Sequence, residues 1–194
     1  MVKPMKKKLV FINACVRQEE SRTLRIAEPV VSALSKRYAV TRYDLPEMDI
    51  VPLDPGLYAA RGAGEIPQWA VAAARSIAEA DRIVIAAPFW DMSFPAVLKC
   101  FFEQVSLFDV TFTDNGKTCV GLCKAPEVLY ITTRGMDIAT GSELEQATPY
   151  IKALSHLWNL GELTTVAAQN MDYSSPEEIE EKIAGCIEEG LQWK

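Results

Sequence analysis

The segment best suited to binding a ligand is 86–95, which reads AAPFWDMSFP. It follows the apolar run 83–85, typical of a buried strand, and precedes the segment 96–107, typical of a helix. In open α/β sheets, ligands bind at the carboxyl edge of the strands, where such a junction lies. Its aromatic and methionine side chains offer a flat apolar wall, which suits a planar ring better than a charged metabolite. The alternative is that Phe89 and Trp90 are ordinary core side chains.

A second candidate is the segment 13–23, which reads NACVRQEESRT. It contains neither G-x-G-x-x-G nor a Walker sequence, which argues against a dinucleotide-binding Rossmann site and a P-loop ATPase. Ser21 and Thr23 stand at the amino end of a predicted helix. Hydroxyls and free backbone amides there bind phosphate, helped by the helix dipole and by Arg17 or Arg22. The alternative is that Ser21 only caps the helix.

The third candidate is the segment 132–137, which reads TTRGMD and follows a later apolar run. Its Gly135 allows the backbone to approach a flat ring closely, because glycine has no Cβ. A glycine-containing turn after a strand explains the same residues without a ligand. Taken singly, each of the three loops has such an explanation, but the three together favour a ligand site.

These loops need strands and helices to position them. Strands are predicted at 9–14, 39–43, 82–87, 127–133 and 163–168, and helices near 23–36, 67–79, 95–107, 149–160 and 176–191. This alternation predicts an α/β protein with a flavodoxin-like, doubly wound parallel sheet of five strands and helices on both faces. In such a sheet the loops after the first, third and fourth strands meet at the switch point.

Turn and capping signals refine this outline. The segment 175–178 (SPEE) predicts a helix that starts with a capping box, and the pair Thr148-Pro149 fits a similar start. Two segments, 45–66 and 110–125, are too long for tight turns. The second predicts a β-hairpin insertion with an Asn-Gly turn. Long insertions on a compact domain often form active-site walls or subunit contacts.

Length and composition set the wider limits. The 194 residues fit one domain, expected to span 1–194, and the net charge of −6 argues against a nucleic-acid partner. No run approaches the roughly 18 apolar residues needed to span a bilayer, and the run 9–12 is too short for a signal peptide. We therefore expect a cytoplasmic protein with no membrane partner.

Five irregularly spaced cysteines favour reduced thiols. The single histidine, His156, argues against a metal site and is expected to be structural or exposed.

With these motifs in place, the chain resembles the FMN-dependent NAD(P)H oxidoreductases of flavodoxin-like fold, most closely the NADH:quinone reductase and azoreductase group. The resemblance covers nearly the whole length and rests on the order and spacing of six motifs. They are 21–23 (SRT), 87–95 (APFWDMSFP), 98–103 (LKCFFE), 110–116 (VTFTDNG), 132–135 (TTRG) and 148–151 (TPYI).

The resemblance implies non-covalently bound FMN, NADH or NADPH as electron donor, and a homodimer in which the second subunit completes each cleft. It also implies roles for particular residues. The phosphate would be held by Ser21, Arg22 and Thr23, the ring would be lined by Pro88, Phe89, Trp90, Asp91 and Met92, and its pyrimidine end would be covered by Thr133, Arg134, Gly135 and Met136.

The chain departs from the family pattern at three places. Cys15 stands where family members often have a serine that contacts the phosphate, and Arg17 could replace that contact electrostatically. Trp90-Asp91 replaces a common Tyr-Asn pair, which brings a carboxylate near the ring unless Asp91 turns away. Met136 replaces a second glycine and would narrow the site.

The implied activity is two-electron transfer from NAD(P)H to quinone or azo acceptors. Both substrates would use one shallow apolar slot, so ping-pong kinetics are expected, and no side chain is assigned as a catalytic acid or base. One alternative is a one-electron carrier of the flavodoxin kind. Another is a flavin-free hydrolase or regulatory module on the same fold, because many functions share doubly wound sheets.

Overall fold

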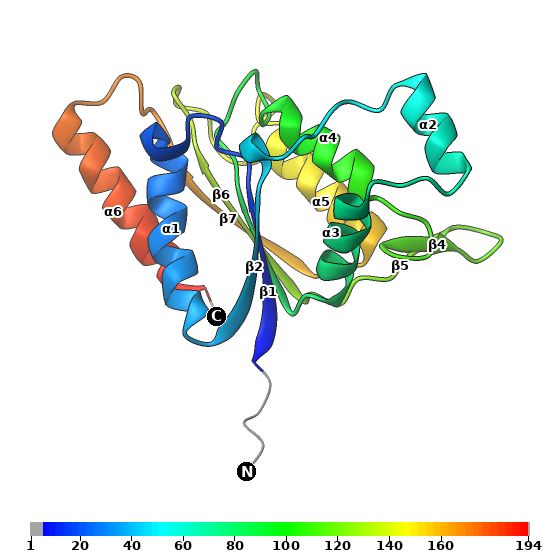
Figure 1. Ribbon diagram of the computed structural model, residues 1–194. Helices are drawn as coiled ribbons and strands as arrows, with labels where there is room; N and C mark the ends of the chain where they lie inside the picture. The colour runs from blue at the N-terminus through cyan, green and yellow to red at the C-terminus, as the bar shows by residue number, and fades with distance from the viewer. Residues whose placement is uncertain (1–5, 194) are drawn as a thin grey trace, which may run out of the picture.

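Five apolar segments form one parallel sheet in the computed structural model, which describes residues 6–193 (Figure 1). The strands lie in the order β2-β1-β3-β6-β7, and every neighbouring pair is parallel. They are β1 (Lys7–Asn13), β2 (Tyr38–Asp44), β3 (Arg82–Ala86), β6 (Glu127–Thr133) and β7 (Glu162–Ala168). This confirms the predicted flavodoxin-like, doubly wound architecture. The carboxyl ends of β1, β3 and β6 are neighbours at one edge of the sheet.

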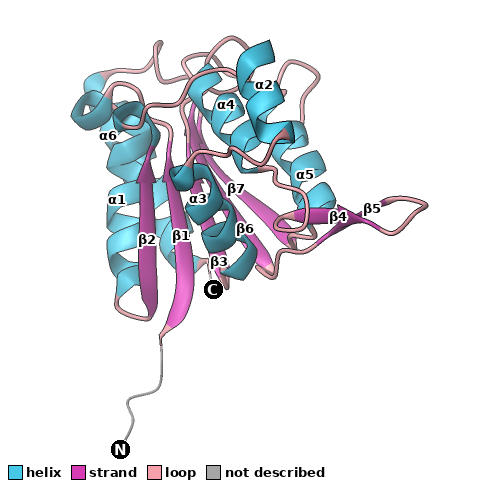
Figure 2. Cartoon of the chain, turned by 45° about the vertical axis from the view of Figure 1, so that its right-hand side comes forward, coloured by secondary structure: helices cyan, strands magenta, loops and turns pink. Residues whose placement is uncertain are grey.

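Helices cover both faces of the sheet (Figures 1 and 2). One face carries α1 (Arg22–Ser35) and α6 (Pro176–Gln192), and the other carries α3 (Gln68–Glu79), α4 (Ala96–Val105) and α5 (Ala147–Trp158). Each face has its own apolar core, and alternate residues of the strands enter the two cores. In β1, Val10 and Ile12 join the core under α3 to α5, whereas Leu9 and Phe11 join the core under α1 and α6. The strands lack polar alternation because both of their faces are buried.

Two predicted helix starts have different outcomes. The capping box at the start of α6 is confirmed, because the Ser175 hydroxyl accepts from the Glu178 amide and the Glu178 carboxylate accepts from the Ser175 amide. The start at Thr148-Pro149 was placed wrongly, since α5 begins at Ala147. The buried carboxylate of Glu145 accepts from the Thr148 amide at 2.8 Å, which satisfies the first turn. Pro149 then lies inside that turn, where no intrahelical donor is needed.

Both long insertions have structure of their own. The segment 45–66 contains a 3₁₀ turn, η2 (Leu45–Glu47), and a short helix, α2 (Pro55–Gly62), neither of which the sequence pattern predicted. The predicted hairpin is confirmed as β4 (Phe112–Asp114) paired antiparallel with β5 (Cys119–Gly121). It projects beside α5 (Figure 2). A short 3₁₀ turn, η1 (Gln18–Glu20), precedes α1.

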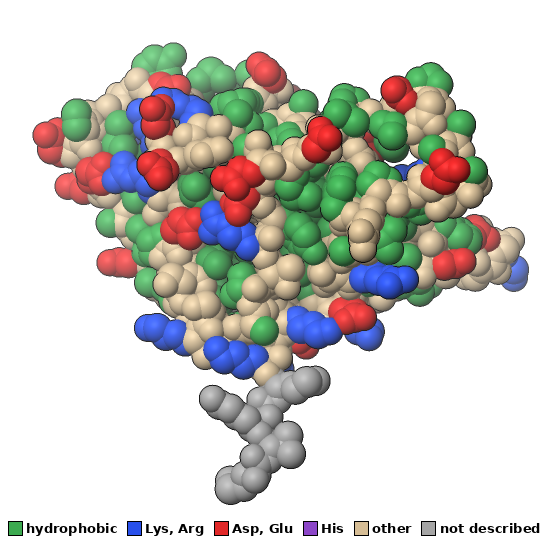
Figure 3. Space-filling model, in the orientation of Figure 1, with side chains coloured by type: hydrophobic (Ala, Val, Ile, Leu, Met, Phe, Trp, Pro, Cys, Tyr) green, Lys and Arg blue, Asp and Glu red, His purple; other side chains and the backbone are tan. Residues whose placement is uncertain are grey.

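The structure does not describe the two ends of the chain. Residues 1–5 and residue 194 are outside the described residues, so the single domain over 1–194 stays a prediction. Within 6–193, none of the helices combines the length and the apolar character needed to cross a membrane. Basic side chains lie along the lower edge of the molecule in Figure 3, whereas acidic ones gather over α1 and α6.

Candidate functional site

The loops after β1, β3 and β6 meet at the carboxyl edge of the sheet and border a cleft of about 160 Å³. The loop after β7 contributes a fourth wall. The cleft is lined by Arg17, Glu20, Ser21, Arg22, Pro88, Phe89, Trp90, Thr133, Gly135, Met171 and Asp172. The three loops singled out in the sequence therefore come together in space, and eight of their predicted site residues line one cavity.

The amino end of α1 forms one end of this cleft. The Ser21 hydroxyl accepts from the Leu24 amide at 3.3 Å, and the Ser21 carbonyl accepts from the Arg25 amide at 3.0 Å. The amides of Arg22 and Thr23 find no acceptor among residues 6–193. A helix start with unpaired amides carries partial positive charge and binds anions. Ser21 does cap the helix, yet its capping leaves two donors free for a ligand.

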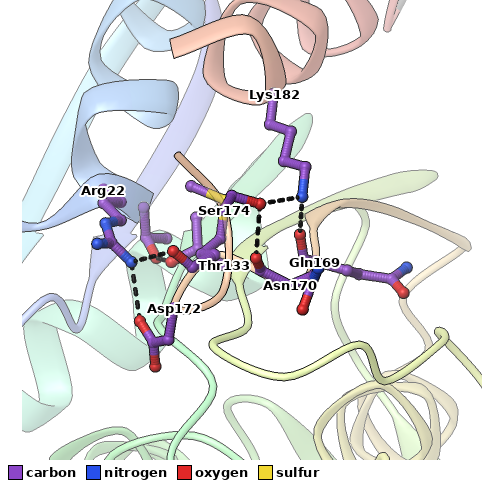
Figure 4. Close-up of polar contacts among 9 residues, drawn as sticks. Arg22, Thr133, Gln169, Asn170, Asp172, Ser174 and Lys182 are labelled. Atoms are coloured by element: carbon purple, nitrogen blue, oxygen red, sulfur yellow. Dashed lines mark hydrogen bonds and ion pairs between the residues drawn. The ribbon is translucent and has the colours of Figure 1, made fainter. Parts of the chain in front are cut away.

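Both arginines of the cleft have carboxylate partners. Arg22 donates to Asp172 at 2.9 Å and to the Met171 carbonyl at 3.0 Å (Figure 4). Arg17 pairs with Glu20 at 3.1 Å. These pairs are largely exposed, and exposed pairs contribute only about 0–1 kcal/mol each. An entering anion can therefore take either guanidinium from its carboxylate at little cost.

The loop after β3 is a tight hairpin that carries the aromatic wall. Trp90 and Ser93 exchange backbone hydrogen bonds of 3.1 and 2.8 Å, which leaves Asp91 and Met92 as the two central residues. Their φ angles are +48° and +65°, the left-handed region that glycine and asparagine favour in such turns. Holding a bulky residue there costs roughly 1–2 kcal/mol. Trp90 faces the cleft and is 39% exposed, whereas the Asp91 carboxylate lies at the exposed tip of the turn and does not line the cleft.

Gly135 lies where another loop crosses it. A Cβ at this position would be 2.0 Å from an Asp172 carboxylate oxygen. The two loops are also joined through their backbones, because the Asp172 amide donates to the Gly135 carbonyl at 3.0 Å. The missing side chain thus lets the loop after β7 pack against the loop after β6. At the end of β6, the Thr133 hydroxyl bonds the Thr23 hydroxyl at 2.7 Å, which ties the strand to α1.

Arg134 does not line the cleft, although the family resemblance placed it at the pyrimidine end of the flavin ring. Its side chain is fully buried, donates to the Ile138 carbonyl at 2.7 Å, and has its charged centre 5.5 Å from the centre of the Phe89 ring. Glu145, also fully buried, lies 3.9 Å away. Burial lowers the pKa of Arg134, and the Glu145 carboxylate opposes that shift. Arg134 therefore supports the wall of the cleft from behind.

Cys15 does not line the cleft either. The residue is fully buried, and its Sγ lies 3.7 Å from the Ala86 carbonyl oxygen. Burial raises the pKa of the thiol to about 12, so it is neutral near pH 7. Two further predicted residues, Met92 and Met136, are part-exposed without lining the cleft, and Thr23 is buried under it.

Sequence reasoning missed three lining residues: Glu20, Met171 and Asp172. Glu20 lies within the segment 13–23 but was not singled out. Met171 and Asp172 follow β7, and the loop after that strand was not among the three predicted to meet. The available signal was topological, because every strand of a parallel sheet ends at the same edge. Among residues 6–193, no three His, Cys, Asp or Glu side chains gather as a metal site, and His156 is exposed.

Comparison with known proteins matches residues 7–192 to a family described as having a flavodoxin-like fold. An FMN-dependent NADH:quinone oxidoreductase of Clostridium perfringens is 27% identical over 199 residues, covering 95% of this chain and 96% of the relative. A second such enzyme, from Clostridium acetobutylicum, is 32% identical over 121 residues, which cover 61% of this chain and 60% of that relative.

Solved structures agree on the architecture. An azoreductase from Bacillus anthracis strain Sterne superposes with a TM-score of 0.78 at 22% identity, covering 96% of this chain and 97% of that one. A second structure is described as an FMN-dependent NADH-azoreductase from Bacillus anthracis strain Ames Ancestor in complex with FMN. It superposes with a TM-score of 0.77 at 18% identity, covering 95% of this chain and 97% of that one. At these identities the two structures establish the fold that this chain shares with them.

Proposed function

The chain belongs to the family of proteins with a flavodoxin-like fold, and on this premise we propose that it is an FMN-dependent oxidoreductase passing electrons from NAD(P)H to quinone or azo-type acceptors. The observation that carries the proposal is the cleft itself. It has two unpaired amides at the start of α1 and an apolar wall from the loop after β3. FMN combines a phosphate with a flat ring, and the cleft offers a matching surface to each. The names of the relatives support the same cofactor and the same acceptors.

The phosphate is assigned to the start of α1. The amides of Arg22 and Thr23 and the hydroxyl of Ser21 supply donors there, and the helix dipole adds attraction. Arg22 and Arg17 supply positive charge once they leave Asp172 and Glu20. No thiol contact from Cys15 is needed, because its Sγ is buried and neutral near pH 7.

The ring is assigned to the opposite wall. Pro88, Phe89 and Trp90 offer its apolar contact surface, while Thr133 and Gly135 border its other end. When bound, FMN supplies hydride transfer, and the protein supplies binding, orientation and local charge. Arg134 packs against Phe89 from behind and does not line the cleft, so no contact with the flavin ring is assigned to it. No side chain of the cleft is assigned as a proton donor or acceptor.

The small size of the cleft bears on kinetics and assembly. Its volume of about 160 Å³ is below the ~300–1,000 Å³ typical of sites that enclose a ligand. The outer face of a bound ring would remain open, so NAD(P)H and the acceptor would use it in turn, in a ping-pong, two-electron reaction. A second copy of the chain would complete the site. Exposed apolar side chains support this contact, among them Val51 and, in α2, Tyr58.

The test begins with the visible spectrum of the purified protein, before and after addition of FMN. We expect flavin absorbance that bleaches on addition of NADH and returns on addition of a benzoquinone. Initial rates at several quinone concentrations should give parallel double-reciprocal lines, whereas intersecting lines would contradict the ping-pong order. Failure to bind FMN even after reconstitution would overturn the cofactor assignment and favour a flavin-free module.

A pair of arginine variants tests the phosphate end. Arg22→Met removes the guanidinium beside the unpaired amides and should weaken FMN binding by about tenfold, since hydrogen bonds to charged groups contribute about 1.5–3 kcal/mol. Arg25→Met is the matched control, because Arg25 lies about one turn further along α1, outside the cleft, and its guanidinium pairs with Glu180. Equal effects of the two variants would contradict the assignment. The readout is quenching of FMN fluorescence.

A further inference from the structure

A groove of about 620 Å³ lies between α5 and the outer strand β7, and it shares no lining residue with the cleft. Its volume falls within the ~300–1,000 Å³ range of small-molecule sites. The strand β7 stands at the end of the sheet order, so α5 and β7 leave this side open. The groove is larger than the cleft to which the cofactor is assigned. Nothing in the proposed reaction uses it.

One face of α5 forms the first wall. Thr148, Lys152, Ser155 and His156 line the groove. Their spacing of three and four residues places them on one side of the helix. The second wall is β7, from which Leu163 and Thr165 project to the same face of the sheet because they are two residues apart. Regular elements therefore hold these side chains, which gives the groove a fixed shape.

The hydroxyl of Ser155 is the most informative group in the groove. The residue is only 4% exposed, yet its Oγ has no hydrogen-bond partner among the described residues. Three other serines in helices or at their ends donate to a carbonyl about one turn earlier: Ser35, Ser76 and Ser106, at 2.7, 3.0 and 2.7 Å. Ser155 makes no such bond. A buried hydroxyl without a partner destabilises the fold, so a partner from the groove is expected.

A second hydroxyl on the same wall is also buried without a hydrogen-bond partner among the described residues. The Oγ1 of Thr148 is buried and has no partner among residues 6–193. It lies two turns before Ser155 along the helix face, and Lys152 lies between them. Across the groove, Thr165 adds another hydroxyl, and Leu163 adds an apolar surface. Hydroxyls both donate and accept, which suits a ligand that itself carries several hydroxyl groups.

Charge identifies the other part of the ligand. Lys152 and His156 are one turn apart, both are exposed, and within the described part of the chain neither forms an ion pair with a carboxylate. Two nitrogen donors at this spacing can hold one phosphate or carboxylate group between them. Glu162, at the start of β7, also borders the groove and can accept a hydrogen bond from a ligand hydroxyl.

We propose that the groove between α5 and β7 binds a small hydroxylated anion of the sugar-phosphate class. Its anionic group lies at Lys152 and His156, and its hydroxyls bond Ser155 and Thr148. The apolar Leu163 packs against its carbon skeleton. This site is separate from the cleft and does not depend on the oxidoreductase activity proposed above.

The test uses the full chain labelled with ¹⁵N and titrated with ribose 5-phosphate, while the backbone amide shifts are followed. We expect saturable shifts in 148–156 and 162–165, with ribose and inorganic phosphate each binding at least about tenfold more weakly, since each supplies only part of the contacts. Shifts confined to the start of α1 would overturn the proposal, as would their absence at millimolar ribose 5-phosphate. If inorganic phosphate binds as tightly as the sugar phosphate, the groove is an anion site without hydroxyl recognition, and the proposal fails.

Matched variants separate the groove from the cleft. Ser155→Ala and Lys152→Met should each weaken ribose 5-phosphate binding by about tenfold. Ser35→Ala, which removes a serine that bonds its own helix, and Lys117→Met, on the hairpin, should leave it unchanged. Arg22→Met alters only the cleft, so a loss of affinity in that variant would overturn the assignment to the groove. Thermal melts of all variants check that each is folded.

Discussion

The guanidinium of Arg134 lies 5.5 Å from the centre of the Phe89 ring, and both side chains are shielded from solvent. This contact joins the loop after β6 to the loop after β3. Arg134 also bonds the Ile138 carbonyl and lies 3.9 Å from the buried Glu145, which caps the start of α5. One buried charge thus connects two of the loops that border the cleft and ties them to the start of α5. The position of the aromatic wall depends on this interior contact.

The first prediction concerns that buried pair. Arg134→Met leaves the Glu145 carboxylate buried without its cation, and breaking such a pair typically costs about 3–5 kcal/mol. The double variant Arg134→Met, Glu145→Gln removes both charges and should recover a large part of that loss. The measurement is the free energy of unfolding in urea. A loss below about 1 kcal/mol in the single variant would contradict the role given to Arg134.

The second prediction concerns competition at the phosphate end. Asp172→Asn removes the carboxylate that pairs with Arg22, so FMN or inorganic phosphate should bind up to about fivefold more tightly, as the exposed pair contributes up to about 1 kcal/mol. Glu180→Gln is the matched control, because it breaks a comparable exposed pair with Arg25 outside the cleft. Fluorescence quenching by the protein gives the FMN affinity. Weaker binding in Asp172→Asn would show that the carboxylate assists the ligand.

The third prediction concerns the strained turn. Met92 holds a φ of +65° in the second central position of the hairpin, where glycine is strongly preferred. Met92→Gly should raise the free energy of unfolding by about 1 kcal/mol, because it relieves the left-handed strain. Met136→Gly changes a methionine of similar exposure at an ordinary φ and should give no such gain. If both variants lower stability equally, the strain at Met92 is negligible.

The fourth prediction concerns pH above neutrality. Burial raises the pKa of the Cys15 and Cys123 thiols from 9.0 to about 12, so the folded state disfavours their ionised forms. The contribution to stability is fully present below pH 9 and is lost as pH rises from about 9 toward 12. Each thiol should lower the free energy of unfolding by about 1.4 kcal/mol per pH unit in that window.

Urea unfolding between pH 8 and pH 10.5 checks this slope. Unfolding must be reversible throughout this pH range, because only then is the free energy of unfolding defined. Cys15→Ala should reduce the slope, whereas Cys119→Ala, at an exposed position, should not. Thiol labelling of the native protein offers a second readout. Cys119 should react first, and Cys15 and Cys123 only after unfolding, because thiolates are the reactive form. Rapid labelling of Cys15 would contradict its burial.

Local signals explain why much of the fold was predictable. The runs at 9–12 and 83–85 are apolar without alternation, which is typical of strands covered on both faces. The Asn115-Gly116 pair places the hairpin turn, and Gly116 has the expected positive φ of +83°. The helix that starts at Ser175 follows from a capping box confined to four residues. Each of these features depends on neighbours in sequence.

The sequence by itself therefore determined the five strands of the parallel sheet, the five long helices and the three loops that meet at the switch point. Only the tertiary structure decided which side chains of those loops face the cleft. Arg134 turns inward because Glu145 and Phe89 offer it a buried counter-charge and a ring face. Asp172 enters the site because its loop crosses Gly135 and reaches Arg22, 150 residues earlier in the chain. The local sequence pattern determines which strand a residue follows. The direction of its side chain depends on partners distant in sequence, which only folding brings near.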